Sequence, residues 1–227
     1  MDEDGRITRG SLLKLGGFVA AALGVAAWKT GAGPAGVASG AVKCVLTPEL
    51  TEGPYYIPNE KVRRDITEGR PGARLTLRAT VLDASTCKPI KGAAVDIWHC
   101  DASGTYSGVG TQQAVGSTFM RGIQKTNASG LAVFKTIYPG WYTGRAVHIH
   151  VKVHVGGTVV HTGQLFFPDA LTDAVYRQAP YSSRPARDVR NANDSIFRNG
   201  GSKGIVSIRK NAAGGYVATI AMGVHRA

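Results

Sequence analysis

Apolar and polar residues alternate along much of this chain, and a period of two predicts β-strands. The clearest run is RLTLRATVLDA at residues 74–84, in which leucine, alanine and valine occupy alternate positions. Successive side chains of a strand point to opposite faces, so this run fits a strand with one buried face. Comparable runs lie at 93–100, 119–126, 131–137, 146–155, 158–167, 204–210 and 215–224.

Turn-forming residues separate these runs at short intervals. NASG at 127–130, the two glycines at 156–157 and NAAG at 211–214 each join two runs, which predicts β-hairpins. No segment shows a convincing amphipathic helical pattern. Residues 176–203 are polar and rich in Arg and Asn, and they predict a long ordered loop with room for one helical turn. Many short strands joined in this way favour a β-sandwich.

The composition changes this picture little. A chain of 227 residues is long enough for one domain with a substantial core. It has 27 Lys and Arg against 15 Asp and Glu, which gives a formal net charge of +12. These basic residues are scattered, with no long run and no interleaved aromatic residues, so the sequence does not favour a nucleic-acid-binding face. We interpret the charge as a basic, solvated surface.

The first 41 residues, 1–41, have the character of an export signal followed by a small-residue linker. Arginines precede an apolar stretch from Leu12 to Trp28, and small residues follow it. The sequence TRGSLLK at residues 8–14 resembles a twin-arginine export motif in which Gly10 replaces the second arginine. The pattern predicts secretion, through a twin-arginine-like or a general export route.

The same stretch is a poor candidate for a retained membrane anchor. Lys14 and several glycines interrupt it, which disfavours a membrane-spanning helix. We therefore expect cleavage around residues 39–42 and no stable membrane partner afterwards. The remaining residues, 42–227, are predicted to form a single β-sandwich domain.

Three cysteines follow the expected cleavage region: Cys44, Cys87 and Cys100. Export would expose them to oxidising conditions, which permit one disulfide and one remaining thiol. If the runs at 74–84 and 93–100 form a hairpin, Cys87 and Cys100 lie about 20 Å or more apart. That separation is too large for a disulfide. We therefore expect a pair that includes Cys44, with either partner.

The stretch GWYTGRAVHIHVKV at residues 140–153 concentrates candidate chemistry. His148 and His150 are two residues apart, so on a strand both side chains point to the same face. Two neighbouring imidazoles suit a metal ion. The H-x-H pattern alone is a weak indication, because a β-rich chain can carry it by chance.

Tyrosines rather than carboxylates accompany this pair. Tyr142 precedes it, and Tyr106 lies in a Gly- and Ser-rich loop at 101–117. With an ordinary pKa of about 10, a tyrosine binds a metal only when a strongly charged cation displaces its proton. Ferric iron is such a cation, whereas a zinc site built on tyrosinates would be unusual. The residues alone leave open that these tyrosines only pack at the end of the sandwich.

Two other classes of protein remain open at this point. His154 shares the parity of the H-x-H pair and His161 lies on the next strand, so a cupin-like metalloenzyme could use histidines alone. The glutamate that usually follows such a pair is absent from VKVHVGG at residues 151–157. The other alternative is a non-catalytic, transthyretin-like β-sandwich that acts as a binding module.

Four segments in order resemble the intradiol ring-cleavage dioxygenases, and in particular their short, secreted, protocatechuate-dioxygenase-like branch. They are TEGPYY at 51–56, VDIWHCDASGTYSG at 95–108, YPGWYTGRAVHIHVKV at 138–153 and GQLFF at 163–167. Four motifs in the same order are far more specific than any one of them. The resemblance implies an all-β fold, a β-sandwich with long active-site loops.

The resemblance also implies a metal centre, a ferric ion, Fe(III), held by two tyrosinates and two histidines. Tyr106 and Tyr142 fall on the positions of the two tyrosine ligands. His148 and His150 fall on the positions of the two histidine ligands.

Further positions match residues that surround this metal in the family. Gln164 falls on the glutamine of the strand after the hairpin. The segment that borders the substrate pocket corresponds to Gly53, Pro54 and Tyr55. One departure is His99, which follows Trp98 where the cytosolic relatives commonly have glutamine.

The implied reaction cleaves a catechol-type ring between its two hydroxylated carbons. Dioxygen is the second substrate, and the product is a muconate-type diacid. Tyr142 would leave the metal as the catechol binds and accept one of its protons. Arg145 falls on the active-site arginine of the family and would stabilise negative charge on the substrate, with Gln164 helping to place the oxygen. The particular catechol and the oligomeric state stay open.

Overall fold

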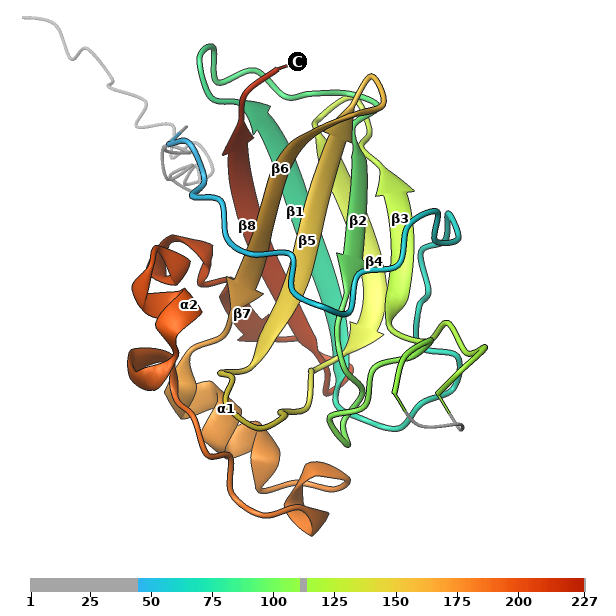
Figure 1. Cartoon of the computed structure of the whole chain (residues 1–227), viewed down its shortest axis with the longest axis vertical. Coiled ribbons are helices and arrows are strands. Elements are labelled where there is room, and N and C mark those ends of the chain that lie inside the picture. The colour runs from blue at the N-terminus through green and yellow to red at the C-terminus, as the bar shows by residue number, and fades with distance from the viewer. Residues whose placement is uncertain (1–44, 111–113, 227) are drawn as a thin grey trace, which may run out of the picture. The chain divides into compact units, whose positions relative to one another are not determined.

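The computed structural model describes residues 45–110 and 114–226, and the predicted export segment and Cys44 lie outside this part of the chain. Within it, the strands form two four-stranded sheets (Figure 1). The strands are β1 (Arg74–Asp83), β2 (Ala94–Trp98), β3 (Arg121–Lys125), β4 (Leu131–Ile137), β5 (His148–Val155), β6 (Thr158–Phe166), β7 (Ser207–Lys210) and β8 (Tyr216–Val224). Each predicted run holds one strand, so the all-β prediction is confirmed. The hairpin predicted at residues 127–130 is wrong, because β3 and β4 lie in different sheets and this turn connects the two sheets.

The two sheets have different strand orders. One sheet runs β4-β1-β8-β7, and the other runs β3-β2-β5-β6. Neighbouring strands are antiparallel except for β1 and β8, which are parallel. The β5–β6 hairpin turns at Gly156 and Gly157, both of which have positive φ, as a two-residue hairpin turn requires. Its register places His150 opposite Gln164.

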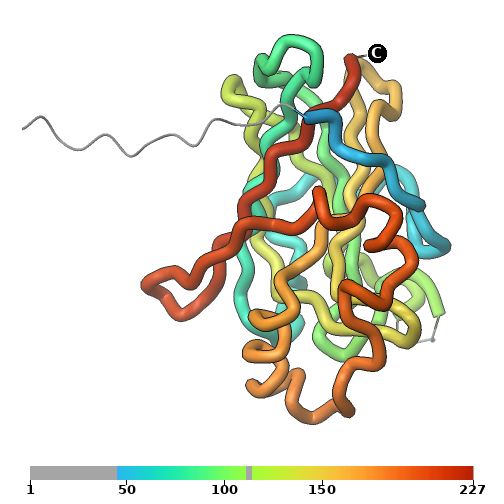
Figure 2. The backbone as a smooth tube through the Cα atoms, turned by 90° about the vertical axis from the view of Figure 1, so that its left-hand side faces the viewer, coloured from blue at the N-terminus to red at the C-terminus, as the bar shows by residue number. Residues whose placement is uncertain are grey.

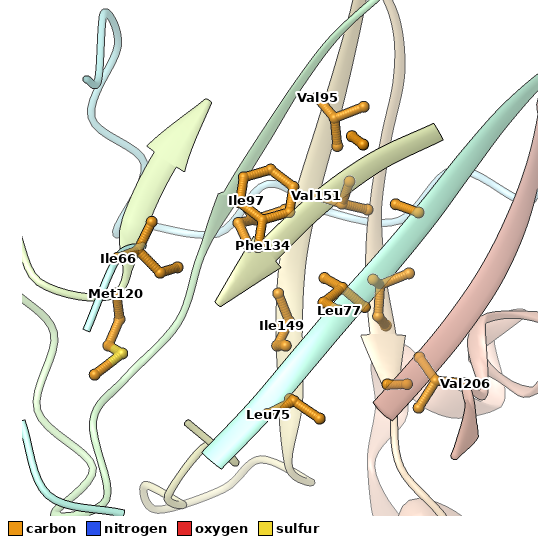
Figure 3. Close-up of a cluster of buried hydrophobic side chains, with 14 of the residues drawn as sticks. Ile66, Leu75, Leu77, Val95, Ile97, Met120, Phe134, Ile149, Val151 and Val206 are labelled. Atoms are coloured by element: carbon orange, nitrogen blue, oxygen red, sulfur yellow. The ribbon is translucent and has the colours of Figure 1, made fainter. Parts of the chain in front are cut away.

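The core lies between the sheets. In β1, Leu75, Leu77, Ala79 and Val81 are at most 1% exposed, and they alternate with polar residues. Figure 3 shows Leu75 and Leu77 in one buried cluster with Ile149 and Val151 of β5. The inner faces of the two sheets therefore pack on each other, as the period-two pattern predicts.

Strand β5 is buried on both faces, which is unusual for a sequence that alternates polar and apolar residues. The segment at residues 45–68 crosses the outer face of its sheet, as the blue chain in Figure 1 shows. The amide of Leu50 donates to the carbonyl of Thr162 on β6, and the amide of Arg63 donates to the carbonyl of Ile123 on β3. Polar side chains on this outer face are thus enclosed, and enclosure is costly unless they find partners.

The expectation of no clear amphipathic helix is wrong, because α1 (Asp169–Tyr176) follows β6. Only Thr172 and Val175 of this helix are buried, so its apolar stripe is too short to detect as a period. The expected long loop is confirmed as a mostly irregular segment that runs back towards β7, coloured orange to red in Figure 2. It contains α2 (Ser195–Arg198) and the 3-10 turns Tyr181–Ser183, Asn191–Asn193 and Gly201–Gly204. None of the helices described has the length and apolar character needed to cross a membrane.

The described cysteines agree with the prediction that Cys87 and Cys100 do not bridge. Cys87 lies in the turn between β1 and β2 with φ of 60° and is disulfide-bonded. Cys100 is buried, and its thiol is free. Its sulfur atom donates a weak hydrogen bond to the carbonyl oxygen of Gly140 at 3.4 Å.

Candidate metal centre

The start of β5 brings two imidazoles together on the outer face of its sheet. The Nε2 atoms of His148 and His150 are 3.0 Å apart. Nδ1 of His148 lies 2.6 Å from the carbonyl oxygen of Ala146. A carbonyl accepts only, so Nδ1 carries the proton and Nε2 keeps its lone pair. That tautomer is the one in which Nε2 binds a metal and Nδ1 anchors the ring.

A third donor comes from the turn that precedes β5. The hydroxyl oxygen of Tyr142 lies 3.2 Å from Nε2 of His148 and 3.4 Å from Nη1 of Arg145. Within this turn the amide of Arg145 donates to the carbonyl of Tyr142, and Gly144 adopts φ of +84°. Glycine adopts that conformation without strain. The turn therefore directs the phenol back towards the imidazoles.

Tyr106 comes from the loop that follows β2. The centroid of its ring lies 5.6 Å from that of Tyr142 and 6.2 Å from that of His150. Its hydroxyl oxygen is buried and has no hydrogen-bond partner of good geometry within the described residues. A buried hydroxyl without a partner is costly, which points to a partner outside the protein chain.

Asp101 and Gly104 shape the loop that carries Tyr106. Oδ1 of Asp101 accepts hydrogen bonds from the amides of Ser103 and Thr105, at 2.9 and 3.1 Å. Gly104 has φ of +85°, and a Cβ atom there would lie 2.2 Å from the carbonyl oxygen of Trp141. The loop is therefore packed directly against the turn before β5, and this close approach requires glycine.

Burial controls the protonation of these four side chains. Burial raises the pKa of Tyr142 to about 12, although Arg145 opposes the rise, and it holds the pKa of Tyr106 well above its ordinary value. Burial, together with Arg145, lowers the pKa of His148 to about 3. Burial and then His148 lower the pKa of His150 well below 6.5. At neutral pH the imidazoles are thus neutral, as metal ligands must be, and the phenols ionise only beside an added cation.

The donor set fits a hard, highly charged metal ion. The described residues contain no group of three or more His, Cys, Asp or Glu side chains that could hold a metal. A metal at this place therefore needs the phenol oxygens of Tyr106 and Tyr142 in addition to the two imidazoles. The unpartnered hydroxyl of Tyr106 is the observation that supports this reading. Phenolate oxygen suits a ferric ion better than a soft cation.

Aromatic rings enclose the four donors. The ring of Trp98 stacks on His150, with centroids 4.9 Å apart and an interplanar angle of 5°. The ring of Tyr55 stacks on Tyr106 at 4.4 Å and meets the edge of Tyr142 at 5.8 Å. These rings hold the imidazole and phenol planes in place and exclude water from one side.

The covering segment approaches the imidazoles at Gly53. A Cβ atom at Gly53 would lie 3.2 Å from Cε1 of His150, and Gly53 has φ of +73°. Pro54 is exposed, between Gly53 and Tyr55 in sequence. An opening of about 220 Å³ reaches the surface at this end of the sheet. Its lining residues are Tyr55, Gly104, Thr105, Tyr106, Val109, Gly110 and Tyr142.

Arg145 and Gln164 lie together beside the tyrosine. Nη2 of Arg145 donates to Oε1 of Gln164 at 2.5 Å. The side-chain amide of Gln164 donates to the carbonyl oxygen of Thr51 at 2.9 Å, which ties β6 to the covering segment. Nε of Arg145 donates to Oδ2 of Asp194 at 2.9 Å. The structure thus brings together all six residues predicted as metal-binding or catalytic.

Asp194 was not among the residues predicted from the sequence, and Trp98 had no predicted role. Asp194 lies in the segment predicted as a loop, and it caps α2 by accepting from the amides of Ile196 and Phe197. An aspartate before a short apolar pair is a recognisable helix-start signal. That signal indicates the cap but not the contact with Arg145.

The other histidines do not join the pair. His154 lines a separate pocket with Tyr56 and Asp96. Nε2 of His161 lies 2.6 Å from the position that a Cβ atom at Gly163 would take. No group of three or more His, Cys, Asp or Glu side chains that could hold a metal exists in the described part of the chain. His99 is fully buried, with Nδ1 facing the carbonyl of Cys100 and Nε2 facing the Thr136 hydroxyl. The cupin-like alternative therefore lacks its ligand set.

Comparisons with solved structures identify relatives with this arrangement of strands. An intradiol ring-cleavage dioxygenase from Tetranychus urticae is 36% identical, with a TM-score of 0.74 over 80% of this chain and 95% of that one. The dioxygenase domain of a dioxygenase and carbohydrate-binding fusion protein from Streptomyces sp. SirexAA-E is 31% identical. Its TM-score is 0.61 over 80% of this chain and 99% of that one.

Sequence comparisons agree. Catechol 1,2-dioxygenase 1 from Acinetobacter lwoffii is 33% identical over 101 residues, which are 42% of this chain and 32% of that protein. The match thus spans about a third of the length of that curated relative. A family model described as Dioxygenase matches residues 51–179, more than half of the chain. On these matches, the chain belongs to the intradiol ring-cleavage dioxygenase family.

Proposed function

We propose that this protein is a non-haem iron(III) dioxygenase that cleaves catechol-type rings between the two hydroxylated carbons. One observation carries the proposal: Nε2 of His148 lies 3.2 Å from the hydroxyl oxygen of Tyr142 and 3.0 Å from Nε2 of His150. The ring of Tyr106, whose buried hydroxyl has no partner within the described residues, packs against the ring of Tyr142. Two phenols and two imidazoles form an uncommon donor set. Its chemistry favours Fe(III) over the metals that prefer carboxylates or thiolates.

In this proposal Tyr106, Tyr142, His148 and His150 hold the ferric ion. When bound, the ion supplies the charge that ionises the phenols and the Lewis acidity that binds both oxygens of a catechol. The neutral imidazoles present their Nε2 lone pairs without first losing a proton, because burial keeps the pKa of both low. Among the four proposed ligands, the two phenolates therefore carry the negative charge, because both imidazoles are neutral.

Tyr142 is the proposed proton acceptor. Its oxygen would take a proton from a substrate hydroxyl, and a phenol whose pKa is raised to about 12 holds that proton firmly. Nη1 of Arg145, 3.4 Å from that oxygen, would favour negative charge on the neighbouring substrate atoms. Gln164 would orient Arg145 through their shared hydrogen bond and would help to place the second substrate, dioxygen.

The covering segment is the proposed substrate border. Gly53 approaches His150 so closely that a side chain there would push on the imidazole. Tyr55 covers Tyr106 and lines the opening, so it would contact the catechol ring as it enters. Pro54 is exposed and is proposed to border the pocket from outside.

The test is iron content, colour and oxygen uptake of the purified protein. Tyrosinate on ferric iron gives a visible charge-transfer band, which should shift when catechol is added. Tyr106→Phe should weaken or shift the band and lower turnover at least about 100-fold. Tyr216→Phe removes the hydroxyl of a buried tyrosine on β8, away from the proposed metal ligands, and should leave the band and the turnover unchanged. A colourless wild type that consumes no oxygen with a panel of catechols would refute the proposal.

We further propose that the protein is secreted. The N-terminal sequence of residues 1–41 motivates this proposal, and the disulfide at Cys87 supports it, because disulfides persist in oxidising compartments. Fractionation of expressing cells is the test. Full-length, uncleaved protein found only in the cytosol would refute it.

A further inference from the structure

A buried carboxylate lies beside Arg145, apart from the four proposed metal ligands. The Asp194 side chain has no exposed surface, and its Oδ2 atom accepts hydrogen bonds from Nε of Arg145 at 2.9 Å and from the amide of Ala146 at 2.8 Å. We propose that Asp194 is a positioning residue for ring cleavage, which acts by fixing the guanidinium of Arg145. This inference rests on the proposed function.

Asp194 is itself held firmly. Its Oδ1 atom accepts from the amides of Ile196 and Phe197 at 2.7 and 3.0 Å, which caps α2. The carboxylate thus has four donors, three of them backbone amides. Backbone amides fix the rotamer of a carboxylate better than mobile side chains can. Asp194 is therefore a rigid support on which Arg145 rests.

The guanidinium of Arg145 is fixed at two of its three nitrogens. Nε is bound to Asp194, and Nη2 is bound to Oε1 of Gln164 at 2.5 Å. A guanidinium is planar and rigid, so two fixed nitrogens determine where the third points. The third nitrogen, Nη1, points towards the hydroxyl of Tyr142 at 3.4 Å. Asp194 therefore decides, through the plane of the guanidinium, where positive charge is presented.

The ion pair between Asp194 and Arg145 is largely buried, which strengthens it. The Arg145 side chain is 18% exposed and that of Asp194 is fully buried. A charge-assisted hydrogen bond away from water is stronger than one at the surface. Part of the Arg145 side chain is in contact with solvent. Without the carboxylate, the guanidinium is therefore expected to turn towards solvent. Small displacements of a charged group beside reacting atoms cost large factors in rate.

The first test is Asp194→Asn. Asparagine also caps helices well, so α2 keeps its start, but the charge that holds Arg145 is lost. We expect iron content and the charge-transfer band to stay near wild type. The dissociation constant for catechol should change less than about threefold, whereas kcat should fall about 10- to 100-fold. Asp173→Asn is the control, because it also removes a carboxylate paired with arginines, on α1, and should leave kcat unchanged. If Asp194→Asn does not fold, Asp194→Ser supplies another capping residue without the charge.

A double-mutant cycle separates positioning from a general structural role. In an Arg145→Ala background, Asp194→Asn should lower kcat by less than about twofold more, because the group it positions is already gone. Losses that multiply in the double variant would overturn the inference. Full kcat in folded Asp194→Asn, with an active wild type, would also overturn it and leave the proposed function intact. An inactive, colourless wild type would overturn the proposed function, and this inference with it.

Discussion

A second buried carboxylate, Asp96 on β2, should make the stability of this protein fall as pH rises. Asp96 is 1% exposed, and neither of its carboxylate oxygens has a hydrogen-bond partner of good geometry in the described part of the chain. Burial raises its pKa from 3.8 to about 7, against the lowering influence of Tyr56, Lys152 and Arg121. We predict that Asp96→Asn stabilises the protein at pH 8, because it removes the need to bury a charge.

The sign and size follow from proton linkage. In the folded chain Asp96 keeps its proton to a higher pH than in the unfolded chain, so the folded state binds more protons between about pH 4 and pH 7. Stability therefore decreases as pH rises through that window and levels off above it. A shift of about three pKa units corresponds to about 4 kcal/mol. About 2 to 3 kcal/mol of this falls between pH 5 and pH 8.

The assay is urea unfolding of iron-loaded wild type and Asp96→Asn at pH 5, 6, 7 and 8. The free energy of unfolding of the variant minus that of wild type should rise by about 2 to 3 kcal/mol across this series. Asp65→Asn is the control: the Thr67 side chain lowers the pKa of Asp65, so Asp65 is ionised throughout and its difference should stay flat. A flat difference for Asp96→Asn, or one that falls with pH, would refute the reasoning.

Three further predictions follow from packing and from the choice of ligands. His154→Ala should leave iron per chain unchanged, as measured by metal analysis, since His154 lines a different pocket; lost iron would favour a histidine-only site. Gly104→Ala should lower the free energy of unfolding by about 1–3 kcal/mol and reduce iron loading, because its Cβ would lie 2.2 Å from the Trp141 carbonyl oxygen. Thermal melts and metal analysis measure these two effects, and a variant with unchanged stability and iron content would contradict the prediction. Leu77→Ala should cost about 2–5 kcal/mol in urea unfolding, as Leu77 is fully buried, and a loss below about 1 kcal/mol would contradict the assigned core.

The strands could be predicted because their causes are local. In β1, apolar residues at alternate positions are enough to produce one buried face, whatever the rest of the chain does. Helix α1 could not be predicted in this way. It spans eight residues and buries only Thr172 and Val175, so its placement depends on the surface it packs against. Local pattern contains no information about that surface.

The site divides along the same line. Strand parity alone places His148 beside His150, since the two are neighbours on one face. The two tyrosines come from separate loops, and only the resemblance to a family joins them to the pair. Asp194 is 49 residues from Arg145 and belongs to neither motif, so nothing near either residue announces their contact. Long-range contacts of this kind become visible only once the chain is folded.

The polar face of β5 is the place where local reasoning is least informative and where function is proposed to arise. The alternation in HIHVKVHV is typical of a strand with one face in water, yet His148 and His150 are at most 2% exposed. Residues 45–68 cross that face, and burial is the main cause that lowers the pKa of both imidazoles. If this face of β5 were in water, both histidines would have an ordinary pKa near 6.5, and protons would compete with a metal for their nitrogens. Burial of this face thus leaves His148 and His150 neutral, which is the protonation state that binds a metal.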